Sequence, residues 1–498
     1  MNHSALGRRL SSAALAASFV LASASSATAA GLYFSDRGVR PIGRGGAFVA
    51  GADDLGSIWY NPAGIAFAGN AVLADASWLR YSTSFQRRTL VKDPATGDET
   101  IQGTNYYPEV SGTTPVLPLP TLAVSNNLGV EKMNFAIGVL APYAALTSYP
   151  ETDIEFRGKK VPPPQRYSLF TLDGSALAVL GAWASYQPIK EFTIGFGVQM
   201  LTGTFASRLA FSACPPENLL CAGEDPQYDA TAQLTVGPIV APSANVGAIA
   251  IVSDQPGAEV RLGFSAQLPF WISARAKSEI RLPGAEMFRN AYVEGSEAEV
   301  KFRLPAIVRG GLETRLGEGK KTRLELSIFY EGWSIHDQIS ITPIGSGIQL
   351  RNVAGLADPY RVGVLAQARG FRDTFSIHGG FERAFSLGGY PMQIRGGASF
   401  ERSAVPAEYL SVLTVDVDKV QTAIGASIYV GDKRTLRLDT VLAWTFGFAV
   451  DVDPRSAAIT KVKAIRANDP PDDRQVKING GRYTASAQVV GVGLSWAY

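Results

Sequence analysis

Apolar and polar residues alternate along several ten-residue stretches of the chain, with the two-residue period of a β-strand that has two different faces. In residues 191–200 the apolar face consists of Phe192, Ile194, Phe196, Val198 and Met200. Glu, Thr, Gly and Gln occupy the positions between them. The same period recurs in residues 322–331, 391–401 and 435–446. The pattern predicts an all-β protein built from long, two-faced strands.

The length and the composition of the two faces indicate what lies on each side of these strands. A soluble β-sandwich also alternates, so the period by itself leaves the surrounding solvent open. The apolar faces, however, run for about ten residues, which is the length that a tilted strand needs to cross a bilayer. The polar faces mix Gly, Ser, Gln, Arg and Glu, a composition that suits a wet lumen. These features favour a transmembrane β-barrel.

A barrel is also favoured because the sequence offers no convincing membrane-spanning helix. The best candidate window, residues 230–252, contains Pro238, Pro242 and Asn245, and we expect two strand halves joined by a bend there. A closed antiparallel barrel satisfies every backbone group without an exposed edge. Counting the alternating segments predicts about fourteen strands, with short turns at the periplasmic end and long loops at the outer end. The expected outer loops are residues 86–118, 146–169, 206–229, 283–297, 342–372, 403–418 and 450–481.

The N-terminus has the composition of a secretory signal peptide. Arg8 and Arg9 precede an apolar stretch, and residues 27–29 form an A-x-A cleavage site, so the mature chain is expected to begin at Ala30. A retained membrane anchor is the alternative, but the apolar core is short and rich in Ser. Removing residues 1–29 takes two of the 46 Lys and Arg residues and none of the 44 Asp and Glu residues, which leaves 44 of each. This balance argues against nucleic-acid binding.

Export also bears on the two cysteines, Cys214 and Cys221. In an oxidising compartment we predict a disulfide between them, which would stabilise the fold by about 2 to 3 kcal/mol through the constraint on the unfolded chain. A redox or metal role is less favoured, because the spacing is not that of a C-x-x-C motif and no His lies nearby.

Residues 43–64, GRGGAFVAGADDLGSIWYNPAG, resemble the N-terminal hatch of the FadL/TodX family of outer-membrane transporters for long-chain fatty acids and other hydrophobic compounds. The family pattern is a Gly-rich run, a small residue, an acidic pair and an aromatic residue before Asn-Pro-Ala. The matching residues here are Gly43, Gly45, Gly46, Ala47, Asp53, Asp54, Tyr60, Asn61, Pro62 and Ala63. Weaker matches at 304–316, 327–341 and 394–406 extend the resemblance over the mature chain.

The resemblance implies a three-part organisation. Residues 1–29 would be the signal peptide, residues 30–70 a hatch that plugs the lumen, and residues 71–498 a transmembrane antiparallel β-barrel of about fourteen strands. It further implies a monomer that crosses the bacterial outer membrane many times, in contact with membrane lipid and lipopolysaccharide. The last strand alternates and ends in an aromatic residue, Tyr498, where Phe is commoner in the family. Such an ending is similar to the signal that the barrel assembly machinery reads.

Two functional regions follow from the resemblance. In the family the mature N-terminus contributes to an apolar ligand pocket, and the apolar residues of this chain at that place are Leu32, Tyr33 and Phe34. The family also uses a kink in the third strand as a lateral opening into the membrane. The corresponding residues are Gly138, Ala141, Pro142 and Tyr143. Pro142 cannot donate a ladder hydrogen bond, although it would also suit the outer end of an ordinary strand.

The hatch residues have a physical rationale in a barrel of this size. About fourteen strands enclose a lumen too wide for their own side chains to fill, so a separate segment must block it. Asn61 and Pro62 suit a turn, and the glycines permit close approach to the lumen wall. We expect Asp53 and Asp54 to pair with lumen cations. The candidates are Arg323, Arg395 and Arg437.

Two other classes of outer-membrane protein are the alternatives. A general porin would lack a dedicated plug, whereas a lipid-modifying barrel enzyme would need a catalytic group. The mature chain has only His336 and His378, and neither stands beside a recognisable serine nucleophile motif. We therefore assign no catalytic residue, metal ligand or cofactor, and predict a transporter that captures hydrophobic compounds outside, passes them under control of the hatch and releases them laterally.

Overall fold

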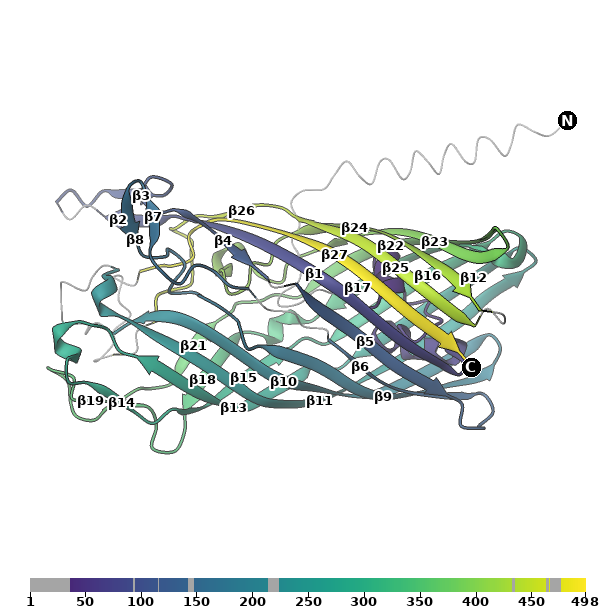
Figure 1. Cartoon of the computed structure of the whole chain (residues 1–498), viewed down its shortest axis with the longest axis horizontal. Helices are drawn as coiled ribbons and strands as arrows, with labels where there is room; N and C mark the ends of the chain where they lie inside the picture. Colours follow the sequence, from purple (N-terminus) through teal and green to yellow (C-terminus); the bar gives the residue numbers. More distant parts are fainter. Residues whose placement is uncertain are drawn as a thin grey trace.

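The computed structural model describes residues 36–92, 95–114, 116–141, 147–213, 224–431, 435–462, 465 and 476–498. In this part of the chain the strands run along one long axis and close on themselves (Figure 1). Strand β27 (Gly481–Ala497) pairs antiparallel with β1 (Ala71–Arg87) along its whole length and so joins the last strand to the first. The expected closed antiparallel barrel of fourteen strands is confirmed.

Several of the fourteen strands of the barrel wall consist of two shorter strands that follow one another in the chain. After β1, the wall consists of β4 (Glu109–Thr113) with β5 (Leu117–Asn126), β6 (Met133–Leu140), β9 (Ala176–Ile189), β10 (Phe192–Ser212), β11 (Asp229–Gln255), β12 (Ala258–Gln267) with β13 (Phe270–Arg281), β15 (Glu297–Leu304) with β16 (Ile307–Leu316), β17 (Thr322–Glu331) with β18 (Gln338–Pro343), β21 (Leu365–Ala368) with β22 (Thr374–Leu387), β23 (Tyr390–Glu401), β24 (Lys419–Val430), β25 (Leu436–Gly447) with β26 (Val450–Val452), and finally β27.

Small elements decorate the outer end of the barrel. They include the hairpins β2 (Thr89–Lys92) with β3 (Glu99–Gln102) and β7 (Ile154–Phe156) with β8 (Lys159–Val161), and the sheet of β14 (Tyr292–Glu294), β19 (Gln349–Arg351) and β20 (Tyr360–Arg361). The short helical turns there and along the wall are η4 (Pro226–Tyr228), η5 (Glu286–Phe288), η6 (Glu318–Lys320), η7 (Trp333–Ile335) and η8 (Ala407–Tyr409). No helix in the described ranges is long and apolar enough to cross a bilayer.

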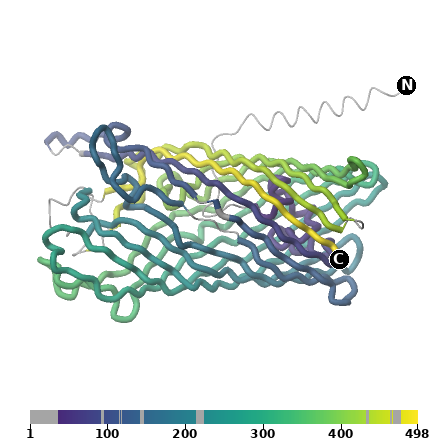
Figure 2. Tube along the Cα trace, in the orientation of Figure 1, coloured from purple at the N-terminus to yellow at the C-terminus, as the bar shows by residue number. Residues whose placement is uncertain are grey.

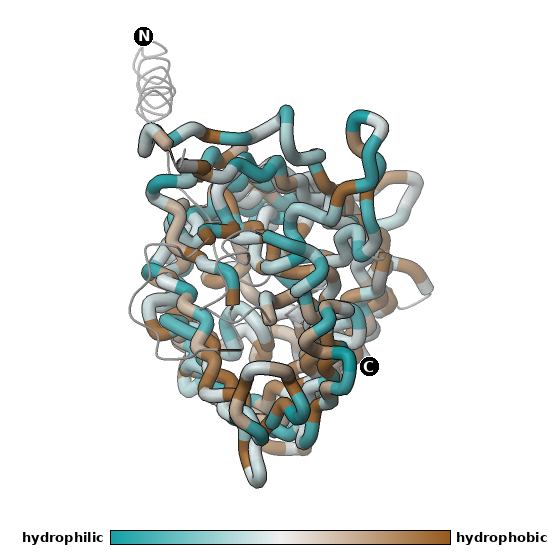
Figure 3. Tube along the Cα trace, turned by 90° about the vertical axis from the view of Figure 1, so that its left-hand side faces the viewer, coloured by the Kyte–Doolittle hydropathy of each residue, from teal (hydrophilic) through white to brown (hydrophobic). Residues whose placement is uncertain are grey.

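The apolar face of the alternating strands points outward, as the sequence predicts. On β17, Leu324 and Ile328 are 46% and 52% exposed, whereas Arg323 and Glu325 between and beside them are buried in the lumen. Viewed along the barrel, apolar and polar residues alternate along the tube (Figure 3). On β13 the exposed face is apolar only as far as Trp271, beyond which exposed polar residues such as Arg275 follow. The outward apolar band therefore ends in an aromatic residue.

The N-terminal segment from Asp36 to Asn70, which we call the hatch segment, lies within the barrel wall near the end where the chain terminates (Figure 2). It contains four short helical turns and is almost wholly buried. The turns are α2 (Val39–Gly43), α3 (Ser57–Tyr60), η2 (Pro62–Gly64) and α4 (Ile65–Ala68). Regular wall structure begins immediately after it, at the first residue of β1.

The window 230–252 lies in one strand, β11, whose two halves pair with β13 and β12, and the register of its pairing with β10 shifts between Gly203 and Phe205. Three expectations about outer loops are wrong. Residues 403–418, expected to face outward, are mostly buried inside the barrel and form what we call the inner loop. Residues 163–172, which we call the inner strap, also fold inward and bridge to β10. Residues 342–372, expected to form one outer loop, include the wall strand β21.

The inner loop turns inward because its backbone finds hydrogen-bond partners there. The Asn479 amide donates to the carbonyl oxygens of Glu408 and Leu410 at 2.7 and 2.9 Å. Ser403 donates to the Asp416 carboxylate at 2.7 Å. Apolar residues such as Val412 and Val417 add to the packing in the lumen. Nine of the sixteen residues of the loop are apolar, and its paired polar groups are tolerated in the interior.

Candidate functional site

A buried network of ion pairs joins the hatch segment to the barrel wall. Arg40 contacts Asp53 at 2.5 Å and Asp54 at 3.0 Å within the segment, and reaches Glu382 of β22 at 2.8 Å. Arg44 contacts Glu313 of β16 at 3.0 Å and Glu325 of β17 at 2.9 Å. Most of these groups are buried, and each has a partner of opposite sign, as buried charges require.

The acidic pair that stood out in the sequence faces the wall as well. Asp53 lies 2.7 Å from Arg323, and Asp54 lies 2.7 Å from Arg437. These are two of the three cations that the sequence suggested. The third, Arg395, contacts Glu382 and Asp439 instead.

The charge state of Asp53 follows from these contacts. Burial raises the pKa of its carboxyl, but the guanidinium groups of Arg323 and Arg40 outweigh this effect and hold the pKa well below its ordinary value. A carboxylate with a depressed pKa contributes its stabilisation at every pH above the ordinary value, and loses it only as the pH falls through the lower, folded-state pKa. Asp53 is therefore ionised throughout the neutral and mildly acidic range.

Backbone contacts complete the attachment of the hatch segment. Glu325 accepts hydrogen bonds from the backbone amides of Val49, Ala50 and Gly51 at 2.6, 2.8 and 3.1 Å. Gly45 and Gly46 have φ angles of +62° and +79°, a region that favours glycine. A Cβ atom on Gly45 would lie only 2.6 Å from the backbone nitrogen of Ala398 on β23.

The Asn-Pro turn lies against another part of the wall. The Asn61 side chain donates to the carbonyl oxygens of Val49 and Ala248 and accepts from the amide of Ala63 at 3.1 Å. Pro62 starts η2, where a missing backbone amide costs nothing. The Tyr60 hydroxyl accepts a hydrogen bond from the Arg37 amide at 2.8 Å. Gly43 also lies close to the wall, since a Cβ atom there would be 2.9 Å from Cδ of Arg395.

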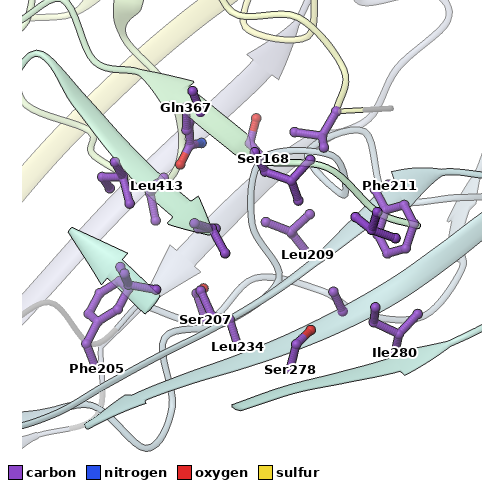
Figure 4. A pocket seen from close by; sticks show the side chains of 18 of the residues that line it. Ser168, Phe205, Ser207, Leu209, Phe211, Leu234, Ser278, Ile280, Gln367 and Leu413 are labelled. Atoms are coloured by element: carbon purple, nitrogen blue, oxygen red, sulfur yellow. The ribbon is translucent and has the colours of Figure 1, made fainter. Parts of the chain in front are cut away.

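The barrel contains an apolar cavity of about 180 Å³. Figure 4 shows side chains that line it. Wall strands, the inner strap and the inner loop all contribute to it. Among its lining residues are Leu172, Leu177, Phe205, Leu209, Leu234, Ile280, Phe302, Ile341 and Leu413. The polar groups in the lining are few, and they include Ser168, Ser207, Ser278, Gln367 and Arg369. Such a site, apolar with a few placed polar groups, is typical of a small-molecule site.

Arg369 is the charged group of this cavity lining. It lies between β21 and β22, before Phe375, and so beyond the outward apolar band. Its guanidinium donates to the Thr414 hydroxyl of the inner loop and stacks 4.9 Å from the Phe371 ring. No carboxylate in the described part of the chain pairs with it, its Nε lacks a partner, and burial lowers its pKa to about 10. A buried cation is stabilised by an anionic partner.

Among the described residues, pairing between β6 and β9 extends to Leu140 and Val179, and a further bridge joins Ser148 to Thr171. Ala141 still donates its amide to the carbonyl oxygen of Pro120 at 3.2 Å, while Gly138 lies within regular pairing.

Several residues singled out from the sequence lie outside the described part of the chain. They are Leu32, Tyr33, Phe34, Pro142, Tyr143, Cys214 and Cys221. Sequence reasoning missed Arg369 and the inner loop. Nothing in the stretch RGFRD distinguishes Arg369 from an exposed arginine. The inner loop does carry a signal, because nine of the sixteen residues in SAVPAEYLSVLTVDVD are apolar.

The sequence of the chain matches a known protein family. The family model described as outer membrane protein transport protein (OMPP1/FadL/TodX) matches residues 20–498. A comparison with curated protein sequences gives no match.

Among solved structures, a FadL homologue of Pseudomonas aeruginosa is similar with a TM-score of 0.67 at 13% identity, over 94% of this chain and 99% of that chain. The toluene transporter TodX of P. putida gives 0.58 at 15% identity, over 93% and 99%. The toluene transporter TbuX of Ralstonia pickettii gives 0.55 at 13% identity, over 93% and 99%. At these identities the likeness shows the fold alone. The family model, matched over nearly the whole chain, shows that the protein belongs to the OMPP1/FadL/TodX family of outer-membrane transport proteins.

Proposed function

We propose that this protein takes up long-chain fatty acids or similar hydrophobic compounds, which it captures from outside in the apolar cavity and releases sideways into the outer membrane. Its family consists of transport channels and not of enzymes. The observation that carries the proposal is the apolar cavity of about 180 Å³ with Arg369 in its lining. No carboxylate of the described residues pairs with this arginine. An apolar chain gains about 0.8 kcal/mol for each buried CH₂ group, and the guanidinium suits an acid head group.

The size of the cavity bears on how much of a cargo it holds. A dry apolar cavity of about 150 Å³ in a protein holds a benzene molecule. The cavity here therefore accommodates one aromatic ring or an alkyl segment of similar volume, and the remainder of a long acyl chain extends beyond it.

The proposed route of the cargo after capture depends on the segment that blocks the lumen and on the place where the cargo crosses the barrel wall. We propose that the hatch segment, held by buried ion pairs at Arg40 and Arg44, closes the direct path, which disfavours a general porin. Leu172 and Leu177 line the cavity, and Leu177 lies two residues from Val179, where the described pairing between β6 and β9 ends. We propose that cargo crosses the wall beside this end, so that an apolar cargo enters lipid without crossing water and keeps the burial that favoured its binding.

Deletion of the gene tests the proposal as a whole. We expect the deletion strain to lose most uptake of a radiolabelled long-chain fatty acid supplied at low concentration, and to regain it when the wild-type protein is restored. A panel of alkanes and monoaromatic hydrocarbons, measured in the same strains, identifies the preferred class. Equal uptake of every compound with and without the protein would reject transport.

Lateral release has a separate test at Pro142, which lies outside the described residues. Because proline cannot donate a ladder hydrogen bond, Pro142→Val should allow strand pairing to continue and narrow the opening. We expect uptake to fall while ligand binding to the purified protein persists. Pro118→Val, at a proline of β5 that already lies in regular pairing with β1, is the matched control. Full uptake by a correctly folded Pro142→Val variant would show that release occurs elsewhere.

A further inference from the structure

Serine side chains interrupt the apolar lining of the cavity in a regular arrangement. Ser207 of β10 pairs in register with Leu234 of β11, and Leu234 pairs with Ser278 of β13. The three residues form one row across three neighbouring strands and all face the cavity (Figure 4). Ser168 of the inner strap adds another hydroxyl to the lining.

These hydroxyls have no hydrogen-bond partner in the described part of the protein, although Ser168 and Ser207 are only 6% and 8% exposed. Some buried serines of the lumen are paired. Ser175 donates to the carbonyl oxygen of Ala206 at 3.1 Å, and Ser265 donates to that of Tyr60 at 2.5 Å. Others, such as Ser57 and Ser411, lack a partner but do not line this cavity.

An unpaired hydroxyl in an apolar site has an energetic consequence for the ligand. A plain hydrocarbon would displace water from the hydroxyls and leave them without partners, which is unfavourable. A ligand that carries an oxygen at the same place would satisfy them. Sites with such polar groups discriminate strongly against analogues that lack the matching group.

We propose that the serine row is a subsite for a neutral oxygen, a hydroxyl or a carbonyl group, carried on the apolar body of the cargo. The proposal rests on uptake through the apolar cavity and narrows its substrates from plain hydrocarbon tails to oxygen-bearing ones. Neighbouring strands lie about 4.8 Å apart, so Ser207 and Ser278 are about 10 Å apart across Leu234. A single oxygen therefore contacts one serine or the other.

Two compounds that differ by one hydroxyl group test this subsite. Binding of 2-phenylethanol and ethylbenzene to the purified, detergent-solubilised protein is measured at equilibrium, with the partition of each compound into empty micelles subtracted. We expect Ser207→Ala combined with Ser278→Ala to weaken 2-phenylethanol binding about three- to tenfold, the effect of one lost hydrogen bond. Ethylbenzene binding should stay equal or become tighter. The two single variants then identify which serine the oxygen contacts.

Ser273→Ala, on the outward face of the same strand β13, is the matched control and should change neither affinity. The subsite is refuted if ethylbenzene and 2-phenylethanol bind the wild type and the double variant equally well. It is also refuted if both compounds lose affinity together, which indicates damaged packing. Failure of the wild type to bind either compound would instead reject the cavity as the uptake site.

Discussion

Replacing Arg40 and Arg44 together by methionine should open the barrel to ions. The two arginines are the hatch-segment cations that contact the wall carboxylates Glu382, Glu313 and Glu325. Methionine keeps an apolar stem but removes both charges, and breaking a buried ion pair costs about 3 to 5 kcal/mol. The fraction of molecules with a displaced hatch segment should rise by roughly two to four orders of magnitude. Conductance in planar bilayers measures the change.

The matched control is Arg80→Met, because Arg80 is exposed on the outward side of β1. It should leave conductance at the wild-type level. Heat-modifiable mobility on gels shows whether each variant has formed its barrel. A correctly folded double variant with unchanged conductance would contradict the closing role proposed for the hatch segment.

Replacing Arg369 by glutamine should separate acids from neutral compounds. If the guanidinium receives the carboxylate of a fatty acid, its loss removes a charge-assisted interaction worth about 1.5 to 3 kcal/mol, or roughly a 10- to 150-fold loss of affinity. The methyl ester of the same acid should bind the variant as well as it binds the wild type. Binding of the acid and the ester to purified protein is the measurement.

Two further variants control for other roles of this arginine. Arg303→Gln removes an exposed arginine from the outward face of β15 and should affect neither ligand. Thr414→Val removes the side chain that accepts the Arg369 hydrogen bond, so it reports on anchoring of the inner loop alone. If Arg369→Gln weakens acid and ester equally, and Thr414→Val does the same, Arg369 positions the loop and does not receive the ligand.

Strand faces were predictable from the sequence because they depend only on a local period. Once Leu324, Leu326 and Ile328 alternate with Arg323, Glu325 and Ser327, a closed barrel leaves one side for lipid and the other for the lumen. The burial of the hatch segment within the barrel was predictable for a related reason. The hatch motif combines a short run of glycines, an acidic pair and an Asn-Pro turn, and this combination is distinctive in a sequence. A wide barrel also needs a segment that fills its lumen.

Only the tertiary structure decided which charges meet, where loops turn and where the cavity lies. Arg395 was as good a partner for the acidic pair as Arg323 and Arg437, but register across several strands directs it to Glu382 and Asp439 instead. The inner loop was expected to face outward and is buried, because Asn479 and other distant residues satisfy its backbone.

The lining of the cavity could not be predicted from the sequence, because its residues are far apart in the chain. Ser207 and Ser278 are 71 positions apart in the chain, and Arg369 follows 91 positions later. By itself the sequence determined a two-faced barrel and marked its N-terminal segment as distinct, because alternation and the hatch motif are read within a few residues. The lining of the cavity depends instead on strand register, on the fold of the inner strap and on the inward turn of the inner loop. Those contacts join residues that are distant in sequence, and no local pattern encodes them.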